Sequence, residues 1–196
     1  MDDLPYSNIL SIRRRGKPIP YGGVGEVRED GHANYGFRDL KGDQEAHAHV
    51  PELQSDVALS RLVQSINLPH TGLFTVGCVS GHVDENHGFR DQGYVEFGIN
   101  SMASIADARN YFSVFFHFDD GLKQTGFSGR FAFEWQLEGA TFIEREGVAG
   151  FTCTVFLNSH FHASRAEANQ AWSTALELLG GYLQSVPPMG PDKLFG

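Results

Sequence analysis

Four segments between residues 74 and 157 alternate apolar and polar side chains with a period of two. This pattern is typical of strands that bury one face. The apolar positions are Phe74, Val76 and Cys78; Val95, Phe97 and Ile99; Phe131, Phe133, Trp135 and Leu137; and Phe151, Cys153, Val155 and Leu157. Alternation this regular predicts antiparallel strands with one face toward the core and one wetter face.

Three further segments place apolar residues three and four positions apart, which is typical of helices packed on a core. Their apolar positions are Leu59, Leu62, Val63 and Ile66; Ile105, Ala108, Phe112, Phe115 and Phe116; and Trp172, Ala175, Leu176, Leu179, Tyr182 and Leu183. Residues 1–50 contain seven glycines and three prolines and show neither period. We therefore expect them to form an extended arm.

The segments 99–110 and 157–170 resemble each other. Both begin with an apolar residue followed by Asn-Ser, and both continue after a short spacer with Ala-Ser-x-Ala-acid-Ala. The offset is 58 residues from Asn100 to Asn158 and 60 from Ala103 to Ala163, so the second copy has two extra residues. Because a strand pair precedes each copy, the chain is expected to contain two β-β-α units.

The conserved spacing within the two copies matches a helix start. Ser104 with Asp107, and Ser164 with Glu167, have the spacing of a capping box, in which the hydroxyl and the carboxylate bond to opposite amides. The repeat does not account for the His-Phe-His tripeptide at 160–162, because the first copy has only Met102 in the corresponding gap.

These elements predict an α+β fold. We expect a two-layer sandwich in which a four-stranded, mainly antiparallel sheet, built from two β-β-α repeats, carries helices on one face. The repeat units are expected at about 72–121 and 129–184, within one domain of residues 51–186. The arm of residues 1–50 is expected outside the sheet, and residues 187–196 are expected to form a Pro/Gly-rich C-terminal tail.

Charge and composition narrow the classes of partner. The formal net charge is −9, and residues 51–196 hold 16 acidic against 8 basic side chains, so this body would repel a phosphate backbone. We expect no nucleic acid and no membrane as partner, because no apolar run approaches the length that spans a bilayer. The N-terminus, MDDLPYSNIL, lacks the layout of a signal peptide, so the expected compartment is the cytoplasm.

His160 and His162 are the main candidates for metal ligands. Residues two apart on a strand share a face, and Glu96, Glu134 and Glu138 are expected on the same outer face. The candidate metal site is therefore His160, His162, Glu134 and Glu96, holding a divalent metal; no other cofactor is indicated. We favour the alternative, in which the two histidines are solvated at a strand end.

Three functional hypotheses follow. The leading one is a non-enzymatic, acidic interaction protein that binds a partner protein through the open sheet face or the arm, with a homo-oligomer as a further option. The order of helices and strand pairs is similar to that of type III secretion chaperones, and an immunity protein or an assembly subunit fits equally well. The alternatives are a metal-dependent enzyme using His160 and His162, and a binder of a small apolar ligand beneath Trp135 and Trp172.

The capping assignment yields a stability prediction. Replacing Ser164 by Ala removes a side-chain acceptor from the first turn of the last helix, so we expect a loss of about 1 kcal/mol. A thermal melt of the variant beside wild type measures the effect. An unchanged melting temperature would contradict the cap.

Overall fold

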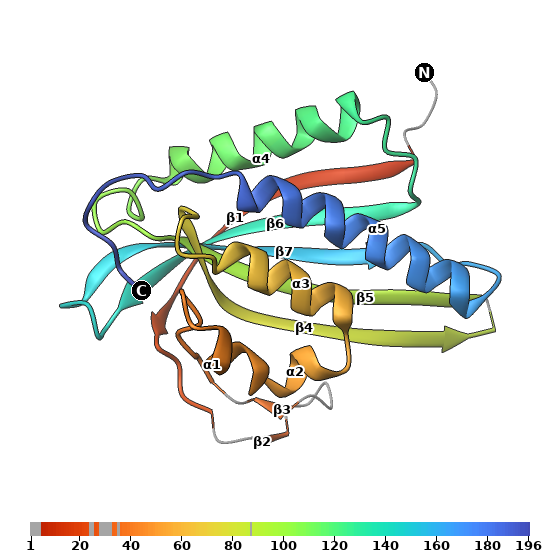
Figure 1. The fold of residues 1–196 in the computed structure, drawn as a ribbon. Helices are drawn as coiled ribbons and strands as arrows, with labels where there is room; N and C mark the ends of the chain where they lie inside the picture. Colours follow the sequence, from red (N-terminus) through yellow and green to blue (C-terminus); the bar gives the residue numbers. More distant parts are fainter. Residues whose placement is uncertain (1–4, 24–25, 28–32, 35, 87) are drawn as a thin grey trace.

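The computed structural model describes residues 5–23, 26–27, 33–34, 36–86 and 88–196 of the chain. Its main feature is a five-stranded sheet with the order β1-β6-β7-β5-β4 (Figure 1). The strands are β1 (Tyr6–Ile19), β4 (Leu73–Glu85), β5 (Gly88–Ile99), β6 (Phe131–Phe142) and β7 (Val148–Ser159). Two short strands, β2 (Glu26–Val27) and β3 (Ala33–Asn34), form a separate pair.

The helices are α1 (Gln44–Ala48), α2 (Pro51–Gln54), α3 (Val57–Ile66), α4 (Ala108–Gln124) and α5 (Arg165–Gln184). The three long helices, α3, α4 and α5, cover one face of the sheet, and α3 packs on α5 (Figure 1). The core lies between these layers, where Trp135 is 1% exposed and contacts the rings of Phe97, Phe115 and Phe118. The fold is therefore α+β, with a strand pair before each of α4 and α5.

The expectation of a four-stranded, mainly antiparallel sheet with an arm outside it was wrong. The sheet is mixed and has five strands, because β1 from the expected arm pairs in parallel with β6, starting at Tyr6 opposite Phe131. A parallel edge strand needs a partner on one side only, and its partner here is more than 100 residues away in sequence. A local period could not reveal that pairing.

Side chains on β1 explain why it joins the sheet. Tyr6 and Leu10 point toward the helices and contact the core. Asn8 takes the position between them, where its side chain accepts a hydrogen bond from Trp135 Nε1 (2.9 Å) and donates one to Asp119 of α4 (3.1 Å). Because this inward position holds a polar residue, the apolar alternation is interrupted and does not predict the strand.

Of the two expected capping boxes, the Ser164 cap is confirmed, with the returning carboxylate bonded to the amide before the cap residue, and the Ser104 box is wrong. Ser164 caps α5, accepting from the Glu167 amide (3.3 Å), while the Glu167 carboxylate accepts from the Ala163 amide (3.1 Å). The cap of α4 is Asp107, and the helix begins at Ala108. The Ser104 hydroxyl instead donates to the backbone oxygen of Met189 (2.9 Å), so a contact with the C-terminal segment replaces the local cap.

The sheet is strongly curled at one end. Phe142 of β6 and Phe74 of β4 have ring centroids 6.0 Å apart, although β7 and β5 lie between their strands. Three strand spacings in a flat sheet span about 14 Å between backbones, so the two rings lean toward each other over the intervening strands. A second apolar cluster fills the concave side here, formed by Ile19, Phe74, Val76, Ile105, Ala140, Phe142, Leu194 and Phe195. This cluster closes one end of the face that the helices leave open.

A buried lysine ties residues 36–43 to the end of α3. Lys41 is 4% exposed, and the acceptors nearest its Nζ are the backbone oxygens of Leu68 (2.8 Å), Thr71 (2.8 Å) and Leu73 (2.6 Å) and the hydroxyl oxygen of Thr71 (2.6 Å). An ammonium group has three donors, so these acceptors engage all of them.

In the part of the chain that the structure describes, no helix is both long and apolar enough to cross a membrane.

Lys41→Met tests this buried contact. The substitution keeps much of the side-chain volume but leaves buried carbonyl oxygens without donors, so we expect a loss of about 3 kcal/mol of unfolding free energy. Lys123→Met is the control, because Lys123 is an exposed residue paired with Asp119 and such pairs contribute about 1 kcal/mol or less. Urea unfolding of both variants measures the difference, and equal losses would contradict the role of Lys41.

Candidate functional site

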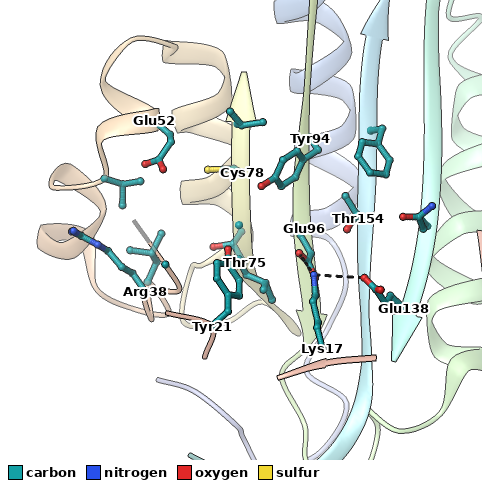
Figure 2. A pocket seen from close by; sticks show the side chains of 18 of the residues that line it. Lys17, Tyr21, Arg38, Glu52, Thr75, Cys78, Tyr94, Glu96, Glu138 and Thr154 are labelled. Atoms are coloured by element: carbon teal, nitrogen blue, oxygen red, sulfur yellow. Dashed lines mark hydrogen bonds and ion pairs between the residues drawn. The ribbon is translucent and has the colours of Figure 1, made fainter. Parts of the chain in front are cut away.

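The open face of the sheet holds a groove of about 480 Å³ beside the curled end (Figure 2). Its floor is made by outward-facing side chains of β5, β6 and β7, and its far wall by residues between 36 and 52. The floor residues are Tyr94, Glu96, Gln136, Glu138, Thr154 and Phe156. Between floor and wall runs β4, the last strand of the sheet, which contributes residues 75–79.

A β-bulge in β4 determines which of its side chains reach the groove. The register shifts between Thr75 and Gly77, so that Val76 is an extra residue relative to β5. The shift leaves Phe74 and Val76 in the second apolar cluster on the open face. Cys78, opposite Val95, instead points to the helix side of the sheet. The uninterrupted alternation through 74, 76 and 78 was therefore wrong, because a bulge moves later residues to the opposite face.

Lys17 of β1 reaches over the floor of the groove. Its Nζ lies 2.6 Å from the carboxylate oxygens of Glu96 and 3.9 Å from Glu138 (Figure 2). Glu96 is 4% exposed, so its charge is compensated by this lysine rather than by water. The pair fastens the N-terminal strand across the sheet and compensates the charge of one of the two floor carboxylates, Glu96, with Glu138 farther from the lysine.

Tyr21 and Cys78 are the groove residues with the clearest pKa shifts. The Tyr21 hydroxyl donates to the backbone oxygen of Val76 (3.1 Å), and burial, with Tyr94 and Glu96 nearby, raises its pKa well above the usual value. Burial raises the pKa of the Cys78 thiol to about 12, with a smaller effect from the negative charge of Glu52. Both groups therefore keep their protons near neutral pH.

The two histidines of the candidate metal site lie beyond the end of β7. His160 is exposed, and its backbone N–H donates to Arg130 O (2.9 Å). His162 exchanges both backbone hydrogen bonds with Phe89 (2.8 and 3.0 Å), which forms an isolated bridge to β5. Phe161 is only partly buried and carries the Arg90 guanidinium over its ring at 5.0 Å. The strand alternation therefore does not continue through 160–162.

The structure does not bring these histidines together with the two glutamates. Glu134 pairs with Phe156 and Glu96 with Thr154, four and six residues before His160 along the chain. At the rise of a strand these separations are about 13 and 20 Å. Among the described residues, no group of three or more His, Cys, Asp or Glu side chains is placed to hold a metal ion. A metal-dependent activity stays a prediction.

The groove also differs from the expected apolar ligand site. Trp135 and Trp172 are 1% and 3% exposed in the packed core, and neither lines the groove. Sequence reasoning missed Lys17, Tyr21 and Glu52, because the first two lie in the expected arm and the third in a four-residue helix. In such segments a single charged or aromatic residue belongs to no periodic pattern, so its position in the fold cannot be predicted.

The Cys78 thiol offers a test of the groove's chemistry. Because its pKa is raised, we expect alkylation by iodoacetamide at pH 8 to be at least 100-fold slower in the native protein than in the unfolded protein. The native rate should rise about tenfold per pH unit up to pH 10, as the thiolate fraction grows. Mass spectrometry of Cys78-containing peptides measures both rates separately from Cys153. Rapid native alkylation with a plateau near pH 8 would contradict the assignment.

We found no match to this chain among protein-family models, curated proteins or solved structures. The function is therefore inferred from the groove and from the edges of the sheet.

Proposed function

We propose that the protein is a non-enzymatic binding protein that receives a partner protein on the open face of its sheet. The observation that carries this proposal is the groove of about 480 Å³, bounded by the N-terminal segment, by β4 and by residues 36–52. An open face that is hollowed rather than covered is a surface on which a partner gains buried area. Ile9, 55% exposed on the same face of β1, extends the apolar part of that surface.

The state of the polar groups supports binding rather than catalysis. Lys17 and Glu96 compensate each other, so neither is poised as a free base or a free acid. Cys78, with its raised pKa, is a poor nucleophile, and the Tyr21 hydroxyl is engaged with Val76. A site organised in this way orients a bound group without activating it.

A small-molecule ligand is the second candidate. The groove volume lies within the range of small-molecule pockets, roughly 300–1,000 Å³. Tyr94 and Phe156 have ring centroids 6.0 Å apart on the floor, where a flat group would find an aromatic surface. Native mass spectrometry of the purified protein distinguishes this candidate, because a retained ligand adds a fixed mass that disappears on denaturation.

Site-specific photocrosslinking tests the main proposal. The photoreactive residue p-benzoylphenylalanine is introduced in place of Phe156 in the groove or in place of Phe116. The second position is 62% exposed on α4, away from the open face, and provides a matched control. After irradiation in a lysate of the source cells, we expect one discrete crosslinked protein from position 156 and none from position 116.

Two results would overturn the proposal. Crosslinks of equal pattern at positions 156 and 116 would show non-specific contact. The absence of any adduct at position 156, when thermal melts show that the labelled protein is folded, would show that the open face is not a protein-binding surface.

A further inference from the structure

We infer that the outer edge of β4, which pairs with no further strand among the described residues, takes up an extended peptide segment of the partner as a sixth strand, and that this segment carries a basic side chain. The inference rests on the proposed function and specifies how the partner is held. Pairing to a sheet edge uses the backbone for affinity and alternate side chains for specificity.

The two edges of the sheet differ in how they are protected. Along β1 lie the exposed Arg13 and Arg15, a register shift between Arg13 and Gly16, and Pro18. Charges, bulges and prolines are the features that keep edge strands from pairing. The β4 segment 76–81, Val-Gly-Cys-Val-Ser-Gly, contains neither charge nor proline. Of these two edges, β4 is the one whose sequence permits another strand to pair.

Side-chain contacts mark both ends of the available edge. At one end, the Tyr21 hydroxyl occupies the backbone oxygen of Val76. At the other, Arg165 forms ion pairs with Asp84 of β4 and Asp91 of β5. Between them, residues 77–82 pair in the described sheet with β5 alone. Six residues of strand span about 20 Å, enough for a peptide of similar length.

The groove follows this edge on both sides of the sheet. Val79 and Tyr94 line it on the open face, whereas Cys78, Leu40 and Val50 line it on the side of the wall. A strand added beside β4 would direct successive side chains alternately to these two sides. The groove therefore supplies pockets for alternate residues of one extended segment, which a flat sheet edge lacks.

Charge indicates the kind of segment. Glu52 lines the wall beside Cys78, and its Oε2 is buried with no hydrogen-bond partner among the described residues (Figure 2). A buried carboxylate oxygen without a donor is unfavourable, and a lysine or arginine of the segment would provide one. The net charge of −9 favours the approach of a basic peptide over that of an acidic one.

The test begins with a phage-displayed library of random dodecapeptides, selected on the wild-type protein. We expect enriched peptides to contain lysine or arginine and to lack proline within a stretch of about six residues. The most enriched peptide is then synthesised, and hydrogen–deuterium exchange is measured for residues 76–86 with and without it. Addition of the peptide should slow amide exchange in this segment at least tenfold.

Three variants locate the contact. Val79→Lys places a charge on the β4 edge, and we expect it to weaken peptide binding at least tenfold. Glu52→Gln should weaken binding of the basic peptide severalfold without changing the exchange of the free protein. Val57→Lys is the matched control, because Val57 is 65% exposed on α3, and it should bind as wild type does. Thermal melts establish that each variant is folded.

Selected peptides that bind without slowing exchange in β4 would overturn the inference. So would enriched peptides that are uniformly acidic, or binding that Val79→Lys leaves unchanged. A failure of this inference is distinguishable from a failure of the proposed function. A crosslink from position 156 without slower amide exchange in β4 would support the open face as the binding surface and exclude the β4 edge.

Discussion

The curl of the sheet is the constraint on which the rest of the structure depends. The rings of Phe74 and Phe142 meet on the concave side across the two strands, β7 and β5, that lie between β4 and β6. The C-terminal segment holds this arrangement, since Phe195 packs on Phe74 with centroids 4.5 Å apart. Asn100 accepts hydrogen bonds from the amides of Leu194 and Phe195. Without the curl there would be no concave face and no place for Lys17 to reach Glu96.

The N-terminal and C-terminal segments thus complete a fold that the two β-β-α units begin. Lys17 and Tyr21 come from the first, and Leu194 and Phe195 from the second. Both lie against the end of the open face where the apolar cluster forms. The other end stays open, so the groove is a property of the whole chain rather than of the repeat.

Much of the helical layer and four of the five sheet strands were predictable, because each carries a local period that burial imposes. Ser164 was predictable for the same reason, as a cap depends on residues three positions apart. The pairing of β1 was not predictable, since Asn8 accepts a hydrogen bond from Trp135 at a position where an alternating strand has an apolar residue. The repeated Asn-Ser pairs suggest equivalent roles that they do not have. Asn100 accepts a hydrogen bond from the C-terminal segment, whereas Ser159 accepts one from the Asp91 amide. Strand alternation placed Glu96 and Glu138 of the groove floor on the outer face, but the walls of the groove could not be predicted from spacing, since they come from segments without a period.

The bulge at Val76 has a consequence for how such a groove can change. After Val76, the side chains of β4 alternate between the two faces of the sheet, and the one extra residue determines which face each of them takes relative to the residues before it. Deleting Val76 would remove the bulge and leave Gly77 opposite Glu96 and Cys78 opposite Val95, so the later side chains of β4 would keep their present faces. The side chain lost would be that of Val76 itself, which belongs to the second apolar cluster and lines the groove, so a change in length at this point would alter the groove without turning any other residue of β4.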